Sequence, residues 1–174
     1  MNWKQLFLTL SPMKKIVFLL SFLFVAFIGQ AQEIEKWQIT DVENYMKDTA
    51  GKVLVINFWA TFCKPCVAEI PSFISITDKY KSQNVALLLV SLDLPSFYPN
   101  KIASFAKKQG YKANIVWLNE TNADYFCPKI DKTWSGSIPG TLILNTKTGY
   151  RKFFEEEMEA ADFEKELKLA LAIE

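Results

Sequence analysis

The sequence predicts an α/β protein in which a central mixed β-sheet is flanked by helices on both faces. Three observations favour this fold class: apolar β-branched runs recur as candidate buried strands, segments with helical spacing separate them, and a hairpin followed by an amphipathic helix closes the chain. Of the 174 residues, 50% are hydrophobic and 22% are charged, so the chain can fill the core of one ordinary domain.

The expected elements follow from periodicity and from turn residues. Buried strands are expected at 53–58, 85–90 and 114–118. Helices are expected from Asp41 to Lys47, from Cys63 to Tyr80 with a kink at Pro71, over 96–109, and over 160–173. A hairpin is expected over 141–144 and 150–154, residues 33–39 are taken as a lead-in, and residues 122–130 are ambiguous because Pro128 interrupts them.

Residues 1–31 are expected to be an export signal and not part of the fold. An apolar run over 16–28 follows two lysines and precedes small residues that end at Ala31, which is the pattern of a secretory signal peptide. The run is short for a membrane span of about 20 residues. We therefore expect a signal peptide followed by one domain over 32–174, with retention as an N-terminal anchor as the alternative and Met13 as an alternative start.

The composition excludes several classes of function. The chain has no histidine, so it can build no Ser-His-Asp triad and no imidazole site for zinc, copper or haem iron. Its three cysteines are too few for an iron–sulfur cage, and a closed zinc site would need a carboxylate ligand. The net charge is +1, with no basic stripe. We therefore expect no bound cofactor, no metal and no nucleic-acid partner.

The motif Cys63-Lys64-Pro65-Cys66 directly follows a predicted buried strand and opens a predicted helix. This spacing puts both sulfurs on the first helical turn, where unpaired amides and the helix dipole favour a thiolate at Cys63. Lys64 adds a positive charge, and Pro65 stiffens the turn. We expect Cys63 to attack a partner's disulfide and Cys66 to resolve the mixed disulfide, which requires an exposed Cys63 sulfur.

Other uses of the cysteine pair fit less well. A zinc site would need a second pair, and haem attachment would need a histidine where Val67 stands. A purely structural disulfide that closes so short a loop would restrain little chain entropy. Cys127 is expected to be a buried inert thiol, with a regulatory or resolving role as the alternative. The acidic run 155–157 is expected to be a solvated approach to the last helix.

The motif in its context resembles the thioredoxin superfamily. The stretch Phe58 to Cys66 follows a strand and precedes a helix, and Ile138-Pro139 later precedes a hairpin. The resemblance covers residues 37–174 and implies a thioredoxin-like fold.

Further residues narrow the resemblance to exported TlpA/ResA-like thiol-disulfide oxidoreductases of the Bacteroidetes type. These are the six residues from Thr61 to Cys66, Glu69, Pro71 and the segment 134–141, together with the signal peptide.

The resemblance also implies roles for residues around the cysteines. Pro139 would be a cis proline beside them, and the backbone of Ile138 would pair with an extended substrate chain. Trp59, at the base of the motif, and Phe62, as an apolar lid, would complete the substrate-binding residues. The implied partners are protein thiols or disulfides and a membrane-bound thiol electron donor, with membrane contact only through an uncleaved N-terminal segment.

Three positions depart from the family pattern. Thioredoxins carry a proton-accepting Asp where this chain has Asn57, which cannot take a proton. Glu69 is a candidate replacement, and the competing interpretation is a surface acid of the helix. Phe62 stands where Trp is usual, which keeps an apolar lid but removes an indole donor. Gly140 follows Pro139 where Thr or Ala is more common, and there we expect a looser substrate edge.

These observations predict an exported, periplasmic or otherwise extracytoplasmic thiol-disulfide oxidoreductase that acts on proteins and works in the reducing direction, with an oxidant or isomerase role left open. One alternative is a peroxide-reducing, peroxiredoxin-like enzyme. Such sites place Thr three residues before the attacking cysteine and an Arg nearby, whereas this chain has Ala60 and a single arginine, Arg151. The other alternative is an exported metallochaperone, whose relatives pair the cysteines with a histidine.

Overall fold

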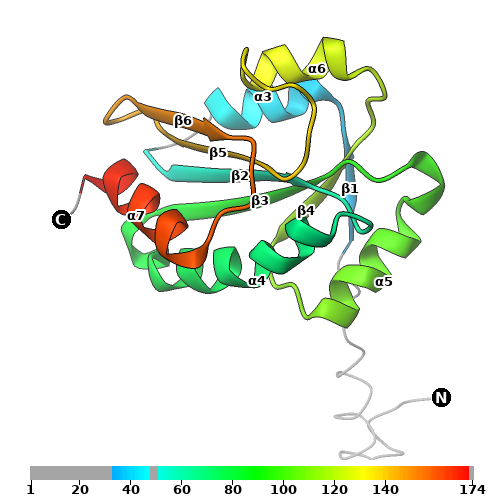
Figure 1. The fold of residues 1–174 in the computed structure, drawn as a ribbon, viewed down its shortest axis with the longest axis horizontal. Helices are drawn as coiled ribbons and strands as arrows, with labels where there is room; N and C mark the ends of the chain where they lie inside the picture. Colours follow the sequence, from blue (N-terminus) through cyan, green and yellow to red (C-terminus); the bar gives the residue numbers. More distant parts are fainter. Residues whose placement is uncertain (1–32, 48–50, 173–174) are drawn as a thin grey trace, which may run out of the picture. The chain divides into compact units, whose positions relative to one another are not determined.

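A computed structural model of the chain describes residues 33–47 and 51–172 (Figure 1). The predicted signal peptide lies outside these residues. Within the described ranges, every helix is too short or too polar to cross a membrane.

Six strands form one mixed sheet, which confirms the predicted fold class. Four strands are parallel, and β5 and β6 join them as an antiparallel hairpin at one edge. Across the sheet the order is β1 (Glu35–Trp37), β4 (Asn114–Leu118), β3 (Val85–Ser91), β2 (Val53–Trp59), β5 (Gly140–Asn145) and β6 (Tyr150–Phe154).

Helices cover both faces of this sheet (Figure 1). One face packs against α3 (Ile39–Lys47) and α6 (Ala123–Ile130). The other packs against α4 (Lys64–Lys79), α5 (Asn100–Gln109) and α7 (Ala160–Leu171).

Strand β2 lies at the centre of the sheet and is buried along its whole length. Successive side chains of a strand point to opposite faces. Leu54 and Ile56 accordingly join the core on the α3 side, whereas Val53 and Val55 join the core beneath α4 and α7. Burial on both faces explains why the strand is an unbroken apolar run instead of an alternating one.

Two boundaries near the N-terminus differ from the sequence prediction. The lead-in contains a short strand, β1, which pairs with β4. Helix α3 begins before Asp41, whose carboxylate accepts a hydrogen bond from the amide of Gln38 at 2.7 Å.

The region between β3 and β4 is also more divided than predicted. A 3₁₀ turn, η2 (Pro95–Phe97), and a cis bond between Tyr98 and Pro99 precede α5.

Other segments of the chain also differ from the prediction. A second 3₁₀ turn, η1 (Lys81–Gln83), links α4 to β3. Pro71 and Pro128 both lie inside helices, so Pro128 does not end α6.

Antiparallel pairing of β2 with β5 positions the functional segment. In this register Phe58 lies opposite Gly140. The segment that enters β5 through Ile138 and Pro139 therefore arrives beside the end of β2, where the chain turns into α4. Residues about 75 positions apart, Cys63 and Ile138, meet because of this pairing.

Candidate active site

Cys63 and Cys66 form a disulfide at the start of α4, with an S–S distance of 2.00 Å. Cys63 is the capping residue of the helix, and its sulfur accepts a hydrogen bond from the amide of Cys66 at 3.3 Å. Lys64 and Pro65 occupy the first exposed turn. The sulfur of Cys63 therefore faces the unpaired amides and the positive end of the helix dipole, as the motif spacing predicted.

The exposure of the two sulfurs corrects one expectation. The structure leaves only 8% of Cys63 exposed and buries Cys66 completely, whereas the sequence argument required an exposed Cys63. Both cysteines pack in one apolar cluster with Trp59 and Ala60, and Ile138 packs against this cluster. Of the two cysteines, only Cys63 therefore keeps any accessible surface.

The bond between Ile138 and Pro139 is cis, as predicted. The carbonyl oxygen of Ile138 lies 3.7 Å from the sulfur of Cys63. A disulfide sulfur carries no proton, so this is a contact here and becomes a hydrogen bond only with a Cys63 thiol. Among the described residues, the backbone groups of Ile138 have no backbone partner, which leaves them available to an extended chain.

Trp59 packs at the base of the motif, as predicted, but it has no exposed surface with which to contact a substrate. It is fully buried and packs against Phe105 and Tyr111, with ring centroids 6.1 Å and 5.8 Å away. It supports the motif from beneath. Phe62, by contrast, is 61% exposed directly before Cys63, where an apolar lid was expected.

Asp93 holds the loop that precedes the cysteines, and the sequence analysis missed it. Its buried carboxylate accepts hydrogen bonds from the Thr61 amide at 3.1 and 3.2 Å, from the Thr61 hydroxyl at 2.6 Å, and from the Ser91 hydroxyl at 2.8 Å. The available signal was a single acid just beyond an apolar strand. The next residue, Leu94, is 58% exposed. The exposed apolar side chains of Phe62 and Leu94 therefore each follow one member of the hydrogen-bonded pair Thr61 and Asp93.

Glu69 is buried in α4 and is not the surface acid that the sequence also allowed. One carboxylate oxygen accepts a hydrogen bond from the side-chain amide of Asn57 at 2.8 Å, and the other accepts one from the backbone amide of Met158 at 2.9 Å. Burial is the largest influence and raises the pKa of Glu69 to about 7, although these two hydrogen bonds oppose it. A carboxylate with this pKa can gain or lose a proton at neutral pH.

Asn57 links Glu69 to β5, the strand that follows Pro139. Its amide nitrogen also donates to the hydroxyl of Thr141 at 3.0 Å, and Thr141 lies opposite Asn57 in the β2–β5 register. Asn57, Glu69 and Thr141 thus form a buried polar cluster that joins β2, α4 and β5. Asn57 holds the carboxylate in place but has no ionisable group of its own.

Gly140 is closely packed where β5 begins, and the expectation of a looser substrate edge there stays a prediction. A side-chain carbon at this position would come within 3.0 Å of the Phe153 ring and 3.5 Å of the Trp134 ring. A larger residue at this position would therefore require the Phe153 ring to shift by a few tenths of an ångström.

Cys127 is a free, buried thiol, as predicted. Burial is the main cause that raises its pKa to about 11, and the charges of Glu155 and Asp124 add to the effect. A thiol in this state is a poor nucleophile at neutral pH.

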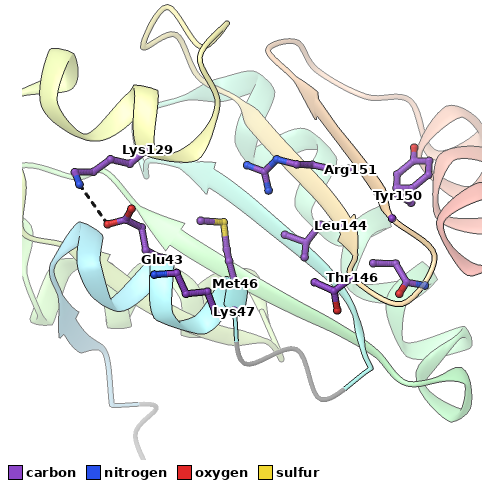
Figure 2. Close-up of a pocket in the computed structure, with 10 residues that line it drawn as sticks. Glu43, Met46, Lys47, Lys129, Leu144, Thr146, Tyr150 and Arg151 are labelled. Atoms are coloured by element: carbon purple, nitrogen blue, oxygen red, sulfur yellow. Dashed lines mark hydrogen bonds and ion pairs between the residues drawn. The ribbon is translucent and has the colours of Figure 1, made fainter.

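A cavity of about 490 Å³ lies between α3, α6 and the β5–β6 hairpin (Figure 2). Glu43, Met46, Leu144 and Arg151 are among its lining residues, and no cysteine lines it. Arg151, the only arginine of the sequence, donates there to the carbonyl of Ile130. The arrangement places this guanidinium in a different site from the disulfide, which disfavours the peroxidase alternative.

The sequence pattern of the AhpC/TSA family matches residues 26–148. Relatives named thiol-disulfide oxidoreductase ResA include those of Geobacillus kaustophilus (strain HTA426), 26% identical over 126 residues, and Bacillus cereus (strain ZK / E33L), 35% identical over 118 residues. The alignments cover 72% and 66% of this chain, and 67% and 62% of the two relatives. The chain thus spans about two thirds of their length.

A solved structure shows the same fold. The thiol:disulfide interchange protein, a thioredoxin family protein, from Chlorobium tepidum TLS superposes with a TM-score of 0.58 at 21% identity. The superposition covers 72% of this chain and 83% of that chain. The described domain therefore has a thioredoxin-like fold.

The raised pKa of Glu69 predicts a pH-dependent stability. The carboxyl group binds its proton more tightly in the folded state, with a pKa of about 7 against an ordinary value of 4.5. The free energy of unfolding should therefore fall by on the order of 2 kcal/mol as pH rises from about 5 to about 8. Because the chain has no histidine, few other groups titrate in this window.

Urea unfolding of the oxidised protein across this pH range measures the effect. Glu69→Gln should remove most of the slope, whereas Asp78→Asn, at an exposed acid of the same helix, should keep it. Equal slopes in the wild type and Glu69→Gln would contradict the assignment.

Proposed function

The chain belongs to the AhpC/TSA family, and we propose that it is a thiol-disulfide oxidoreductase that exchanges disulfides with protein substrates through Cys63 and Cys66. The observation that carries the proposal is a disulfide at the start of a helix in which Cys63 keeps accessible surface and Cys66 has none. The names of the relatives and the thioredoxin-like fold support it.

The exchange proceeds in two displacement steps. In the reduced protein the Cys63 thiolate attacks one sulfur of a substrate disulfide, a Cys63–substrate bond forms, and the other substrate sulfur leaves as a thiolate. Cys66, after losing its proton, attacks the Cys63 sulfur and releases the second substrate thiolate. Two electrons pass to the substrate, two protons are taken up by its thiolates, and the protein is left with the Cys63–Cys66 disulfide.

The direction and location are further parts of the proposal. We place the protein in the periplasm or another extracytoplasmic compartment, because the sequence of residues 1–31 is typical of an export signal. Reduction of substrates there requires a thiol donor that returns electrons to Cys63 and Cys66, and a membrane-bound thiol protein fits this requirement.

Glu69 is proposed as the proton acceptor for Cys66. It lies one helical turn after Cys66 on the same side of α4, and both side chains are buried. Its pKa of about 7 matches the task of taking a proton and then returning it near neutral pH. Asn57 contributes by orienting this carboxylate at 2.8 Å.

Phe62 and Leu94 are proposed to contact substrate next to the attacked sulfur. They are 61% and 58% exposed, and the hydrogen bonds between Thr61 and Asp93 hold their two loops together. An extended chain that pairs with Ile138 would pass this apolar surface. Apolar residues next to the substrate cysteine are therefore favoured.

Substitution of single cysteines tests the order of attack. Cys66→Ser should accumulate a mixed disulfide with a peptide substrate at Cys63, because the resolving sulfur is absent, whereas Cys63→Ser should abolish exchange. Non-reducing electrophoresis and peptide mass spectrometry identify the linked cysteine. Cys127→Ser should behave like the wild type, and a peptide trapped on Cys127 would reverse these assignments.

The proton-acceptor role of Glu69 predicts a changed pH profile. The decay of the mixed disulfide, followed by quenched flow, should accelerate as pH rises through about 7 in the wild type. In Glu69→Gln it should be about tenfold slower at neutral pH, since general base catalysis is lost. Asp78→Asn is the control on the same helix, and an unaltered profile in Glu69→Gln would assign the proton to another acceptor.

The apolar surface predicts a selective loss of peptide reduction. Phe62→Ser and Leu94→Ser should each lower kcat/KM about fivefold for a peptide with leucine beside its cysteine, since burial of an apolar side chain is lost. Reduction of hydroxyethyl disulfide, which has no such side chain, should not change. Leu169→Ser removes a similarly exposed leucine, 52% exposed on α7, and should leave both reactions unaffected. An equal loss with both substrates would point to a disturbed disulfide instead.

A further inference from the structure

One carboxylate clamps the loop that leads into the cis proline. Glu155 accepts hydrogen bonds from the backbone amides of Ser135, at 3.0 and 3.1 Å, and of Ser137, at 2.9 Å. It also accepts one from the Ser135 hydroxyl at 2.5 Å. Three donors from a segment of three residues thus converge on a single side chain.

The register of the hairpin places this carboxylate beside the substrate edge. Phe154, the last residue of β6, lies opposite Thr141, so Glu155 follows at the level where the chain enters β5. The loop that it binds ends one residue before Ile138. The indole nitrogen of Trp134 adds a second restraint by donating to the carbonyl of Ser137 at 2.8 Å.

We infer that Glu155 is a positioning residue for substrate binding: its carboxylate fixes the loop from Ser135 to Ser137 so that the backbone of Ile138 is presented to an extended substrate chain. This inference rests on the proposed function and deepens it. Hydrogen bonds to a charged acceptor are stronger than neutral ones, and a loop ordered before binding lowers the entropy lost when the substrate pairs.

The acids that follow Glu155 carry the same charge but differ in environment, so they allow a specific role of Glu155 to be distinguished from a general effect of negative charge. Glu155, Glu156 and Glu157 follow one another, and the sequence predicted that all three are solvated. In the structure Glu156 is exposed, whereas Glu155 is half-buried under the loop that it binds. Burial favours the neutral form of Glu155, but the hydrogen bonds from Ser135 and Ser137 outweigh it and lower its pKa. The acceptor is therefore charged at neutral pH.

Steady-state reduction by the pre-reduced protein, with dithiothreitol as the electron source, tests the inference. The probes are an extended peptide whose cysteine carries a thionitrobenzoate disulfide, and hydroxyethyl disulfide, which has no backbone to pair. Glu155→Ala should raise KM for the peptide about fivefold and change kcat less than about twofold, because binding and not chemistry is affected. Turnover of hydroxyethyl disulfide should match that of the wild type.

Two further variants and a second readout complete the test. Glu155→Gln, which keeps one acceptor oxygen, should give an intermediate KM, and Glu156→Ala should match the wild type. Hydrogen exchange of the Ser135 and Ser137 amides should be faster in Glu155→Ala than in the wild type, independently of turnover.

The outcomes distinguish the two proposals. An active wild type together with an unchanged peptide KM in Glu155→Ala would overturn the positioning role alone. An equal loss of turnover with both probes would also overturn it, because that pattern indicates damage to the disulfide. A wild type that reduces neither probe would overturn the proposed function and, with it, this inference.

Discussion

The antiparallel pairing of β2 with β5 is the constraint on which the site depends. It joins the strand that delivers Cys63 to the strand that begins just after Pro139, and it sets Asn57 opposite Thr141. The contact between Ile138 and Cys63 and the hydrogen bond between Asn57 and Thr141 are therefore consequences of one register. A shift by one residue would turn every side chain of the shifted strand to the other face and separate these groups.

Around this register, the site combines an apolar enclosure with a few fixed polar groups. Trp59 and Ile138 restrict access to the sulfurs, while Asp93 and Glu155 hold the two loops that border them. Glu69 differs from the other polar groups because burial makes the charged form of its carboxyl group unfavourable. Its hydrogen bonds from Asn57 and Met158 offset only part of that cost, which leaves a group that exchanges its proton near neutrality.

Local patterns predicted most of the sheet and the cysteine site. The apolar run of β2, the Cys63–Cys66 spacing and the helical periodicity of α4 depend on residues near one another in sequence, so periodicity and turn chemistry suffice for them. The fold family and the cis bond at Pro139 came from a resemblance to known proteins.

What the sequence could not predict depends on tertiary contacts. The strand β1 is short and gains its pairing only from β4, about 80 residues later in the chain. The burial of Glu69 and Trp59, the tight fit of Gly140 and the loop contacts of Asp93 and Glu155 require knowledge of which segments meet. Glu155, for example, belongs to a run of three acids, and sequence alone does not show that the loop with Ser135 and Ser137 packs against it. Because Cys66 has no accessible surface, a protein substrate of the proposed exchange would be bound covalently through Cys63 alone, next to the buried sulfur that would release it. Under the proposed exchange, each covalent complex formed at Cys63 would thus include the group that ends it.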